Sequence, residues 1–267
     1  MTNRDRPERT RPAPNHGNRD RSQLLMAWYR LVQVVTGTAW TALAGLRATG
    51  RRHIPAEGGA LLVANHLSHL DVFVLGQLQP RPLNYVARST LFFRPLGAFI
   101  RSVGGFPIQR DGLGAQGVKE TLRRLRNGSL VVLFPEGSRS FDGLLGPLKP
   151  GISALVSRTR VPIVPTGIAG TFEAFPRGRL WPIPHPVRIH FGPPIMPDEY
   201  AGLTPEALST LIRDRMLEAH RTASAHLHRD TGSAPLPSAA HTPTPPPNAP
   251  ARLARLTEIF DWTIQAV

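Results

Sequence analysis

The residues best suited to chemistry lie in one short segment that follows a run of apolar residues. The segment reads Asn65-His66-Leu67-Ser68-His69-Leu70-Asp71. If it curls into a turn of helix, the Asp71 carboxylate can hold one ring nitrogen of His66 while the other nitrogen faces a substrate. The aspartate would fix the ring tautomer and stabilise the imidazolium, so the pair could act as a general base.

Two other interpretations of this segment stay open on spacing alone. His66 could be an ordinary turn residue, with Ser68 or Asp71 capping the following helix. His66, His69 and Asp71 could also ligate a metal ion, although one short turn would then supply every ligand. Ser68 is not predicted to be a hydrolase nucleophile, because the flanking glycines of the Gly-x-Ser-x-Gly elbow are absent.

A second polar segment follows the most apolar strand-like run of the sequence, residues 130–134. It reads Pro135-Glu136-Gly137-Ser138-Arg139-Ser140. Gly137 permits close backbone approach, the serines offer hydroxyl groups, and the Arg139 guanidinium can bind a phosphate through two parallel hydrogen bonds. Open α/β sheets bind ligands at the carboxyl ends of their strands, so the segment is a candidate phosphate-binding loop. On its residues alone, Pro135-Glu136-Gly137 could equally be an ordinary turn. Arg110 closes a third segment, the glycine-flanked extended stretch 104–110.

These segments sit in a pattern of short apolar runs that alternate with helical stretches. Strands are predicted at 60–64, 83–87, 130–134, 161–165 and 187–191. Helical spacing around residues 118–125 ends at Asn127-Gly128, and Thr204-Pro205-Glu206 has the composition of a helix start. The pattern predicts a single α/β domain with a mostly buried mixed sheet flanked by helices.

The N-terminal segment 24–46 is apolar and carries Trp28, Tyr29 and Trp40. Its uncharged run is shorter than the ~20 apolar residues that span a bilayer. It therefore predicts an interfacial helix or helical hairpin with aromatic anchors. A helix packed on the domain's own core would show the same pattern.

The organisation expected for the chain has five parts. They are a disordered basic arm (1–22), a membrane-associating helical segment (23–50), a catalytic domain (51–220), a Pro-rich linker (221–252) and a short helix of unknown role (253–267).

Composition narrows the classes of function. The chain has no cysteine, which excludes disulfides, thiolate nucleophiles and cysteine-based zinc sites. Its net charge is +14, and a surplus of ten positive charges lies within 23–220, which suits an anionic membrane surface, a phosphorylated substrate or nucleic acid. Aromatic residues make up 7% and no reading motif is present, so nucleic acid is not the expected partner.

Taken together, the segments resemble the motifs of the 1-acyl-sn-glycerol-3-phosphate acyltransferase family. The first matches Asn-His-x-Ser-x-x-Asp, and the segment from Phe134 matches Phe-Pro-Glu-Gly-Thr-Arg-Ser with Ser138 in place of threonine. Residues 161–165 match a proline-bounded apolar block. Gln109 departs from the common Ile-Asp-Arg block, although Arg110 is kept. The resemblance extends over residues 24–220.

The resemblance implies transfer of a fatty acyl group from acyl-CoA or acyl-carrier protein to the free hydroxyl of lysophosphatidic acid, giving phosphatidic acid in phospholipid biosynthesis. It implies that His66 is the general base and that Asp71 orients it. The residues implied to bind the acceptor phosphate are Arg110, Glu136, Gly137 and Arg139, and those implied to support the site are Asn65, Ser68 and Ser138.

No cofactor or metal is expected beyond the acyl donor. The lipid acceptor implies a peripheral or monotopic protein at the cytoplasmic face of the cell membrane. Because Gln109 replaces an acidic residue, another lyso-lipid or an alcohol acceptor stays open.

Overall fold

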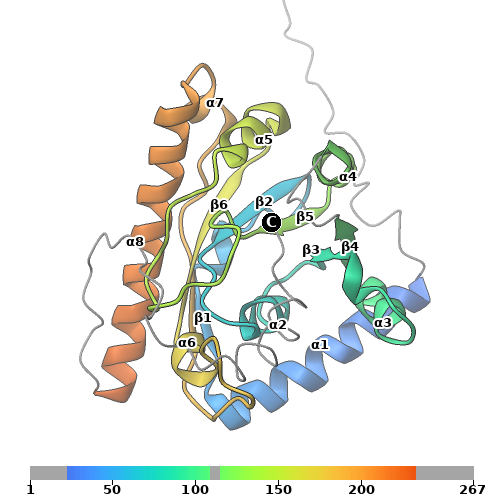
Figure 1. Cartoon of the computed structure of the whole chain (residues 1–267), viewed down its shortest axis with the longest axis vertical. Helices are drawn as coiled ribbons and strands as arrows, with labels where there is room; N and C mark the ends of the chain where they lie inside the picture. Colours follow the sequence, from blue (N-terminus) through green and yellow to red (C-terminus); the bar gives the residue numbers. More distant parts are fainter. Residues whose placement is uncertain (1–22, 109–114, 233–267) are drawn as a thin grey trace, which may run out of the picture.

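The computed structural model describes residues 23–108 and 115–232, and in them seven strands form one sheet (Figure 1). The spatial order is β1-β7-β6-β2-β5-β3-β4, and every neighbouring pair is parallel except β6 and β7. The strands are β1 (Arg47–Thr49), β2 (Ala60–Ala64), β3 (Leu83–Arg88), β4 (Gly105–Ile108), β5 (Leu130–Leu133), β6 (Ile163–Ala169) and β7 (Arg188–Phe191). The predicted mixed sheet is confirmed.

The central strands are apolar throughout because helices cover both of their faces. In β2, Leu61 and Val63 join one core cluster, while Ala60, Leu62 and Ala64 join the other. This alternation follows from the two-residue period of a strand. The predicted strand 60–64 is confirmed, whereas the prediction at 161–165 begins two residues before β6 and ends four residues before its end.

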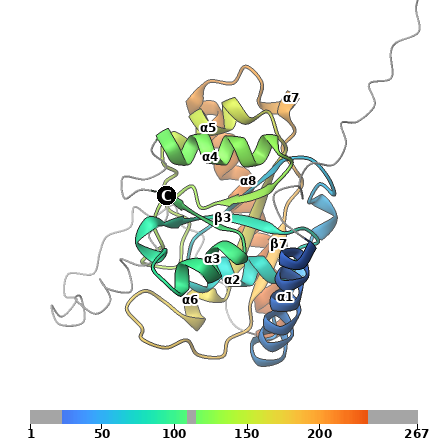
Figure 2. The same ribbon diagram turned by 90° about the vertical axis from the view of Figure 1, so that its right-hand side faces the viewer.

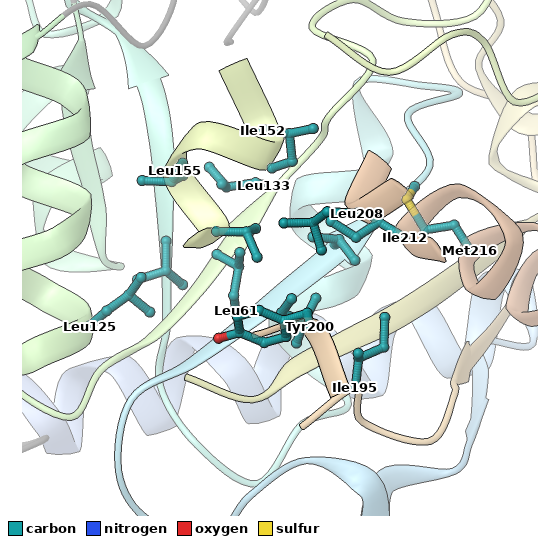
Figure 3. Packing of buried hydrophobic residues seen from close by; sticks show 14 of the residues in the cluster. Leu61, Leu125, Leu133, Ile152, Leu155, Ile195, Tyr200, Leu208, Ile212 and Met216 are labelled. Carbon is teal, nitrogen blue, oxygen red and sulfur yellow. The ribbon is translucent and has the colours of Figure 1, made fainter. Parts of the chain in front are cut away.

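The helices divide between the two faces of the sheet (Figure 2). Their bounds are α1 (Gln23–Ala44), α2 (Leu70–Gln77), α3 (Leu96–Ser102), α4 (Ala115–Arg126), α5 (Gly151–Thr159), α6 (Thr171–Ala174), α7 (Pro197–Tyr200) and α8 (Pro205–Thr231). Figure 3 shows Leu125 of α4, Leu155 of α5 and Ile212 of α8 packed around Leu61 and Leu133. On the other face, Val74 and Leu75 of α2 pack with Leu62.

Helix α8 corrects the predicted end of the domain. Thr204 caps it as expected, since its side chain accepts a hydrogen bond from the Ala207 N–H at 3.2 Å. The helix then continues to Thr231 rather than ending near residue 220, because Ala223 and Leu227 are buried and extend its apolar face. Residues 221–231 are therefore helical and packed, and their assignment to a Pro-rich linker is wrong.

Helix α1 is one continuous helix, so the helical-hairpin alternative is wrong. Tyr29 and Gln33 are buried against the domain, and Gln33 donates a hydrogen bond to the Gly76 carbonyl of α2 at 2.8 Å. The opposite face leaves Leu31, Val34 and Val35 more than half exposed. The helix thus has one face packed on the domain and one apolar face outside it. Among the described residues, no helix combines the length and the apolar character needed to cross a bilayer.

Several predictions fall on other parts of the chain. The basic arm 1–22, the linker from residue 233 onward, the helix 253–267 and the pair Gln109 and Arg110 all lie outside the described residues.

Candidate active site

The predicted pairing of His66 with Asp71 is present at the carboxyl end of β2. The chain leaves the sheet at Ala64, turns, and enters α2 at Leu70, which places Asp71 in the first turn of that helix. The Nδ1 atom of His66 lies 2.8 Å from Oδ2 of Asp71, and the two side chains are 1% and 0% exposed. The five-residue spacing therefore brings the ring and the carboxylate into direct contact.

The Asp71 carboxylate is held from several sides. Its Oδ2 atom also accepts hydrogen bonds from the N–H groups of Leu67 and Ser68, at 2.6 and 2.9 Å. Its Oδ1 atom accepts one from the hydroxyl of Thr171 at 2.6 Å. Hydrogen bonds to a charged carboxylate are strong and directional, so they fix the carboxylate and, through it, the plane of the His66 ring. Asp71 thus shapes the turn as well as orienting the histidine.

The second ring nitrogen of His66 is available to a ligand. Nε2 is buried and has no hydrogen-bond partner among the described residues. The ring stacks on Phe134, with centroids 4.1 Å apart and planes 20° from parallel. His66 also lines an apolar cavity of about 150 Å³, together with Val86 of β3 and Ile100 of α3. A buried nitrogen without a partner costs free energy unless a ligand satisfies it.

Asn65 and Ser68 tie this turn to neighbouring elements. The Asn65 amide donates to the Ile168 carbonyl at 2.9 Å and accepts from the Ile168 N–H at 2.8 Å, which binds the turn to β6. The Ser68 hydroxyl donates to the Phe175 carbonyl at 2.8 Å. Both side chains are committed to the scaffold, the geometry that a supporting role requires.

Glu136 connects the second polar segment to the turn. Its two carboxyl oxygens accept hydrogen bonds from the N–H groups of His66, at 2.8 Å, and Gly146, at 2.7 Å. Burial raises the pKa of Glu136 to about 8 and outweighs these two hydrogen bonds, which lower it. Both oxygens are thus engaged with the backbone, so the geometry favours a role in positioning the loop over contact with a phosphate.

Gly137 and the serines shape the arginine loop. Gly137 has φ 70°, a left-handed conformation that favours glycine, and its N–H donates to the Phe134 carbonyl at 3.0 Å. The Ser140 N–H donates to the His66 carbonyl at 2.7 Å, so the loop and the histidine turn are joined a second time. Ser138 and Ser140 line a cavity of about 300 Å³ with a mixed polar and apolar lining, to which Arg139 and Lys149 contribute basic groups and Glu136 and Asp142 acidic ones.

Arg139 places a buried positive charge beside the histidine turn. It is 2% exposed, and its pKa falls to about 10 because of burial and the nearby charge of Arg177, while Asp71 opposes the change. The guanidinium therefore stays charged at neutral pH in a site of low dielectric, where its attraction for an anion is strong. Arg110, the other predicted phosphate-binding arginine, lies outside the described residues.

His69 is the second histidine of the turn. Its pKa falls to about 3, first because of burial and then because of Arg139, His66 and Arg177. The ring is therefore neutral at physiological pH. Nδ1 of His66 is already committed to Asp71, and the described residues contain no cluster of three or more histidine, aspartate or glutamate side chains that could hold a metal ion.

Three residues of the site were not singled out from the sequence. Phe134 was named as the last residue of a predicted strand and the first of a motif, but without a role in the site. Thr171 is the first residue of α6, and Arg177 lies in the loop after α6. Thr171 lies two residues after the end of β6, a strand that neighbours β2, so knowledge of the strand order would have pointed to it. Arg177 has no local signal, since arginines are frequent throughout this chain.

Comparison with known proteins agrees with this geometry. Residues 45–169, which contain both the histidine turn and the arginine loop, match the family model described as Acyltransferase. This part of the chain, residues 45–169, is therefore similar to the acyltransferase family. The resemblance indicated by the sequence motifs is thereby confirmed, and so is the expectation of an enzyme.

Curated relatives of this acyltransferase carry a more specific name. A 1-acyl-sn-glycerol-3-phosphate acyltransferase of Bacillus subtilis (strain 168) is 26% identical over 164 residues, which cover 60% of this chain and 78% of the relative. One of Limnanthes alba is 33% identical over 145 residues, covering 53% of this chain and 52% of the relative. The acyltransferase thus spans about half the length of the Limnanthes relative.

A solved structure shares the fold of this acyltransferase. It is the crystal structure of the 1-acyl-sn-glycerophosphate (LPA) acyltransferase PlsC from Thermotoga maritima, with a TM-score of 0.65 and 23% sequence identity. The match covers 82% of this chain and 85% of that chain.

Proposed function

We propose that this acyltransferase transfers a fatty acyl group from acyl-CoA or acyl-carrier protein to the free hydroxyl of 1-acyl-sn-glycerol 3-phosphate, giving phosphatidic acid for phospholipid synthesis. The observation that carries the proposal is the buried Nε2 atom of His66, which lacks a partner while Asp71 holds the other ring nitrogen. The names of the relatives indicate the acceptor.

In the proposed step, Nε2 of His66 removes the proton of the acceptor hydroxyl as its oxygen attacks the thioester carbonyl carbon. A carbon–oxygen bond forms, the carbon–sulfur bond breaks, and the thiolate leaves. The imidazolium, stabilised by Asp71, then returns its proton to the sulfur. No covalent enzyme intermediate is required, because the thioester is already an activated acyl group.

The apolar cavity beside His66 suits one of the hydrocarbon chains. Apart from the two histidines and Tyr85, it is lined by aliphatic and phenylalanine side chains, among them Val86, Ile100 and Phe134. Burying methylene groups against such a surface contributes about 0.8 kcal/mol each. We assign this cavity to the acyl chain of the donor, whose carbonyl must reach Nε2.

Two arginines suit the acceptor phosphate. Arg139 is buried next to the histidine turn, and Arg177 lies close enough for its charge to lower the pKa of Arg139. Two guanidinium groups repel each other unless an anion lies between them, and a phosphate dianion matches their charge and their planar donors. We therefore place the phosphate between Arg139 and Arg177.

The substrates place the reaction at a lipid surface. The outward face of α1 carries Leu31, Val34 and Val35, and we propose that this face lies in the membrane interface. The protein would then be peripheral or monotopic at the cytoplasmic face of the cell membrane, where its positive charge attracts anionic headgroups.

The proposed reaction can be tested with purified protein, acyl-CoA and lysophosphatidic acid, with phosphatidic acid as the product measured. Arg139→Ala should raise the KM for lysophosphatidic acid about tenfold or more, because a charged hydrogen bond to the phosphate is lost. The KM for acyl-CoA should change little.

Arg126→Ala, at an exposed position on α4, is the matched control and should leave both constants unchanged. A larger change in the donor KM than in the acceptor KM would reassign the loop to the donor. Wild-type protein that acylates lysophosphatidylcholine but not lysophosphatidic acid would overturn the proposed acceptor.

A further inference from the structure

The loop between α6 and β7 exposes three large apolar side chains close together in sequence. Leu180 is 50% exposed, Trp181 is 79% exposed and Ile183 is 45% exposed. Single exposed apolar residues are ordinary, but a tryptophan and two aliphatic residues within four positions form a patch. Tryptophan is also the residue most typical of membrane–water interfaces, where its ring meets lipid and its N–H meets water.

The backbone of this loop holds the patch outward. The Ile183 N–H donates to the Ala174 carbonyl at 2.8 Å, which closes residues 174–183 into a loop with joined ends. Three prolines, at positions 182, 184 and 186, fix φ and restrict the conformations open to the tip. The exposed side chains are thus presented on a stiff support, so little conformational entropy is lost when they bind a surface.

The loop is attached directly to the active site. The Phe175 carbonyl accepts a hydrogen bond from the hydroxyl of Ser68. The centroid of the Phe175 ring lies 5.7 Å from the centroid of the His69 ring. The guanidinium of Arg177 stacks over Phe141 at 4.1 Å, which ties the loop to the segment after Arg139. A surface that binds the tip of the loop is therefore brought close to the catalytic turn.

The loop and α1 lie at the same end of the molecule. Figures 1 and 2 both place α6 and the loop that follows it at the end occupied by α1, with α7 at the opposite end. Helix α1 exposes the apolar side chains of Leu24, Leu31 and Val34. Exposed Arg179, one residue before the apolar patch, adds positive charge beside it.

We propose that Leu180, Trp181 and Ile183 form a second membrane contact, which inserts into the interface of an anionic bilayer and holds the active site against the lipid surface. The occupant is a lipid bilayer rather than a protein, because the patch combines an interfacial tryptophan with a flanking arginine and lies at the end of the molecule where α1 shows its apolar face. The catalytic part of this inference rests on the proposed function, whereas the binding part does not.

The binding part is tested by sedimentation of the full-length protein with vesicles of phosphatidylcholine and phosphatidylglycerol. Trp181→Ser should weaken binding to these vesicles about fivefold to tenfold, because much of the tryptophan surface leaves the interface. Leu203→Ser, which changes an apolar residue 38% exposed beside α7 at the opposite end, is the matched control and should bind like wild type. Equal binding of Trp181→Ser and wild type would overturn the proposal, and so would equal weakening by Leu203→Ser.

Fluorescence gives a direct readout of insertion. Brominated phosphatidylcholine quenches only tryptophans that reach the lipid chains, and the sequence has four tryptophans. Trp181→Phe keeps an apolar ring, so vesicle binding should persist while part of the quenching disappears. Quenching of the same absolute size in wild type and Trp181→Phe would show that Trp181 stays in water and would contradict insertion.

An activity comparison separates this proposal from the proposed function. Trp181→Ser should lower the rate with lysophosphatidic acid presented in vesicles, but should leave the rate with a short-chain, monomerically dissolved acceptor near that of wild type. Equal loss with both acceptors would assign the loop a structural role and overturn the membrane contact. If wild-type protein lacks transferase activity altogether, the proposed function fails, while the sedimentation and quenching results still decide whether the loop binds lipid.

Discussion

At the scale of single residues, the histidine turn is arranged around one carboxylate. The Asp71 carboxylate contacts the ring of His66. It also accepts hydrogen bonds from the N–H groups of Leu67 and Ser68 and from the hydroxyl of Thr171. The last contact crosses from the end of β6, so it fixes Asp71 relative to the sheet as well as within its own turn. We therefore regard Thr171 as a positioning residue that acts through Asp71.

Thr171→Val keeps the shape of the side chain and removes the hydroxyl. We expect kcat to fall about tenfold with little change in either KM, because the His66 ring is held less firmly. The free energy of unfolding should fall by about 1.5–3 kcal/mol, the usual contribution of a hydrogen bond to a charged group. Thr171→Ser restores the hydroxyl and should recover most of kcat. A purely structural residue would lower the free energy of unfolding without changing kcat in the folded enzyme.

Glu136 makes stability depend on pH. Burial raises the pKa of Glu136 to about 8 in the folded protein, above the ordinary value of 4.5. The folded state therefore binds this proton more tightly than the unfolded state. Its contribution to stability is fully present below about pH 4.5 and is lost as the pH rises through about 8, at up to ~1.4 kcal/mol per pH unit.

Urea unfolding of wild type and Glu136→Gln measures this dependence. Wild type should lose more stability than the variant between about pH 5 and about pH 8, because glutamine cannot ionise. Identical pH dependence of the two proteins would show that Glu136 does not titrate in this range.

The sequence identified the residues of this site that lie close together along the chain. The pairing of His66 with Asp71 needs only the turn between them, and the Gly137 turn follows from its own sequence. Thr171 and Arg177 lie about a hundred residues beyond the histidine, and nothing near them in the sequence points to the histidine turn. Their roles become visible only with the tertiary structure.

At the scale of elements, the strand order is what brings the site together. Strand β2 lies between β5 and β6, so the histidine turn, the arginine loop and Thr171 leave the sheet at the same edge. Apolar runs predicted most of these strands, because parallel strands buried on both faces leave that signal. The order of strands was not predictable, since crossover connections let strands far apart in sequence become neighbours. The short strand β1 was missed because Arg47–Thr49 is too short for a pattern.

The C-terminal end of helix α8 was predicted wrongly, because residues 221–231 were assigned to the Pro-rich linker that follows them. The start at Thr204 was predicted from its cap, but the end was placed near residue 220, although the buried positions Ala223 and Leu227 continue the apolar face beyond it. Arg188 of β7 also pairs with Asp230, so the last turn is tied to the sheet by charge as well as by packing.

Leu227→Ala tests whether this last part of α8 stabilises the domain. The side chain is 4% exposed, and its truncation should lower the free energy of unfolding by about 2–3 kcal/mol. Exposed Arg229→Ala is the control and should change the free energy by less than about 0.5 kcal/mol. Equal, small effects of both changes in urea unfolding would show that residues beyond 220 contribute little to the fold.

At the scale of the whole molecule, the two ends differ in character. Helix α1 and the 174–183 loop carry exposed apolar side chains at the end of the molecule that also holds α6, while the opposite end is formed by α5 and α7 (Figure 1). An enzyme whose substrates are lipids gains from this asymmetry, because the site can receive an acceptor without drawing it fully into water. The net charge of +14 acts in the same direction on an anionic surface.

The central claim is that His66 is the general base of an acyl transfer, and the most direct test is the kcat of His66→Ala with lysophosphatidic acid and acyl-CoA. Circular dichroism and urea unfolding should first establish that the variant is folded. The account predicts that kcat falls about a hundredfold to ten-thousandfold, the usual contribution of general base catalysis, with both KM values nearly unchanged. A folded His66→Ala protein with near-normal kcat would contradict it.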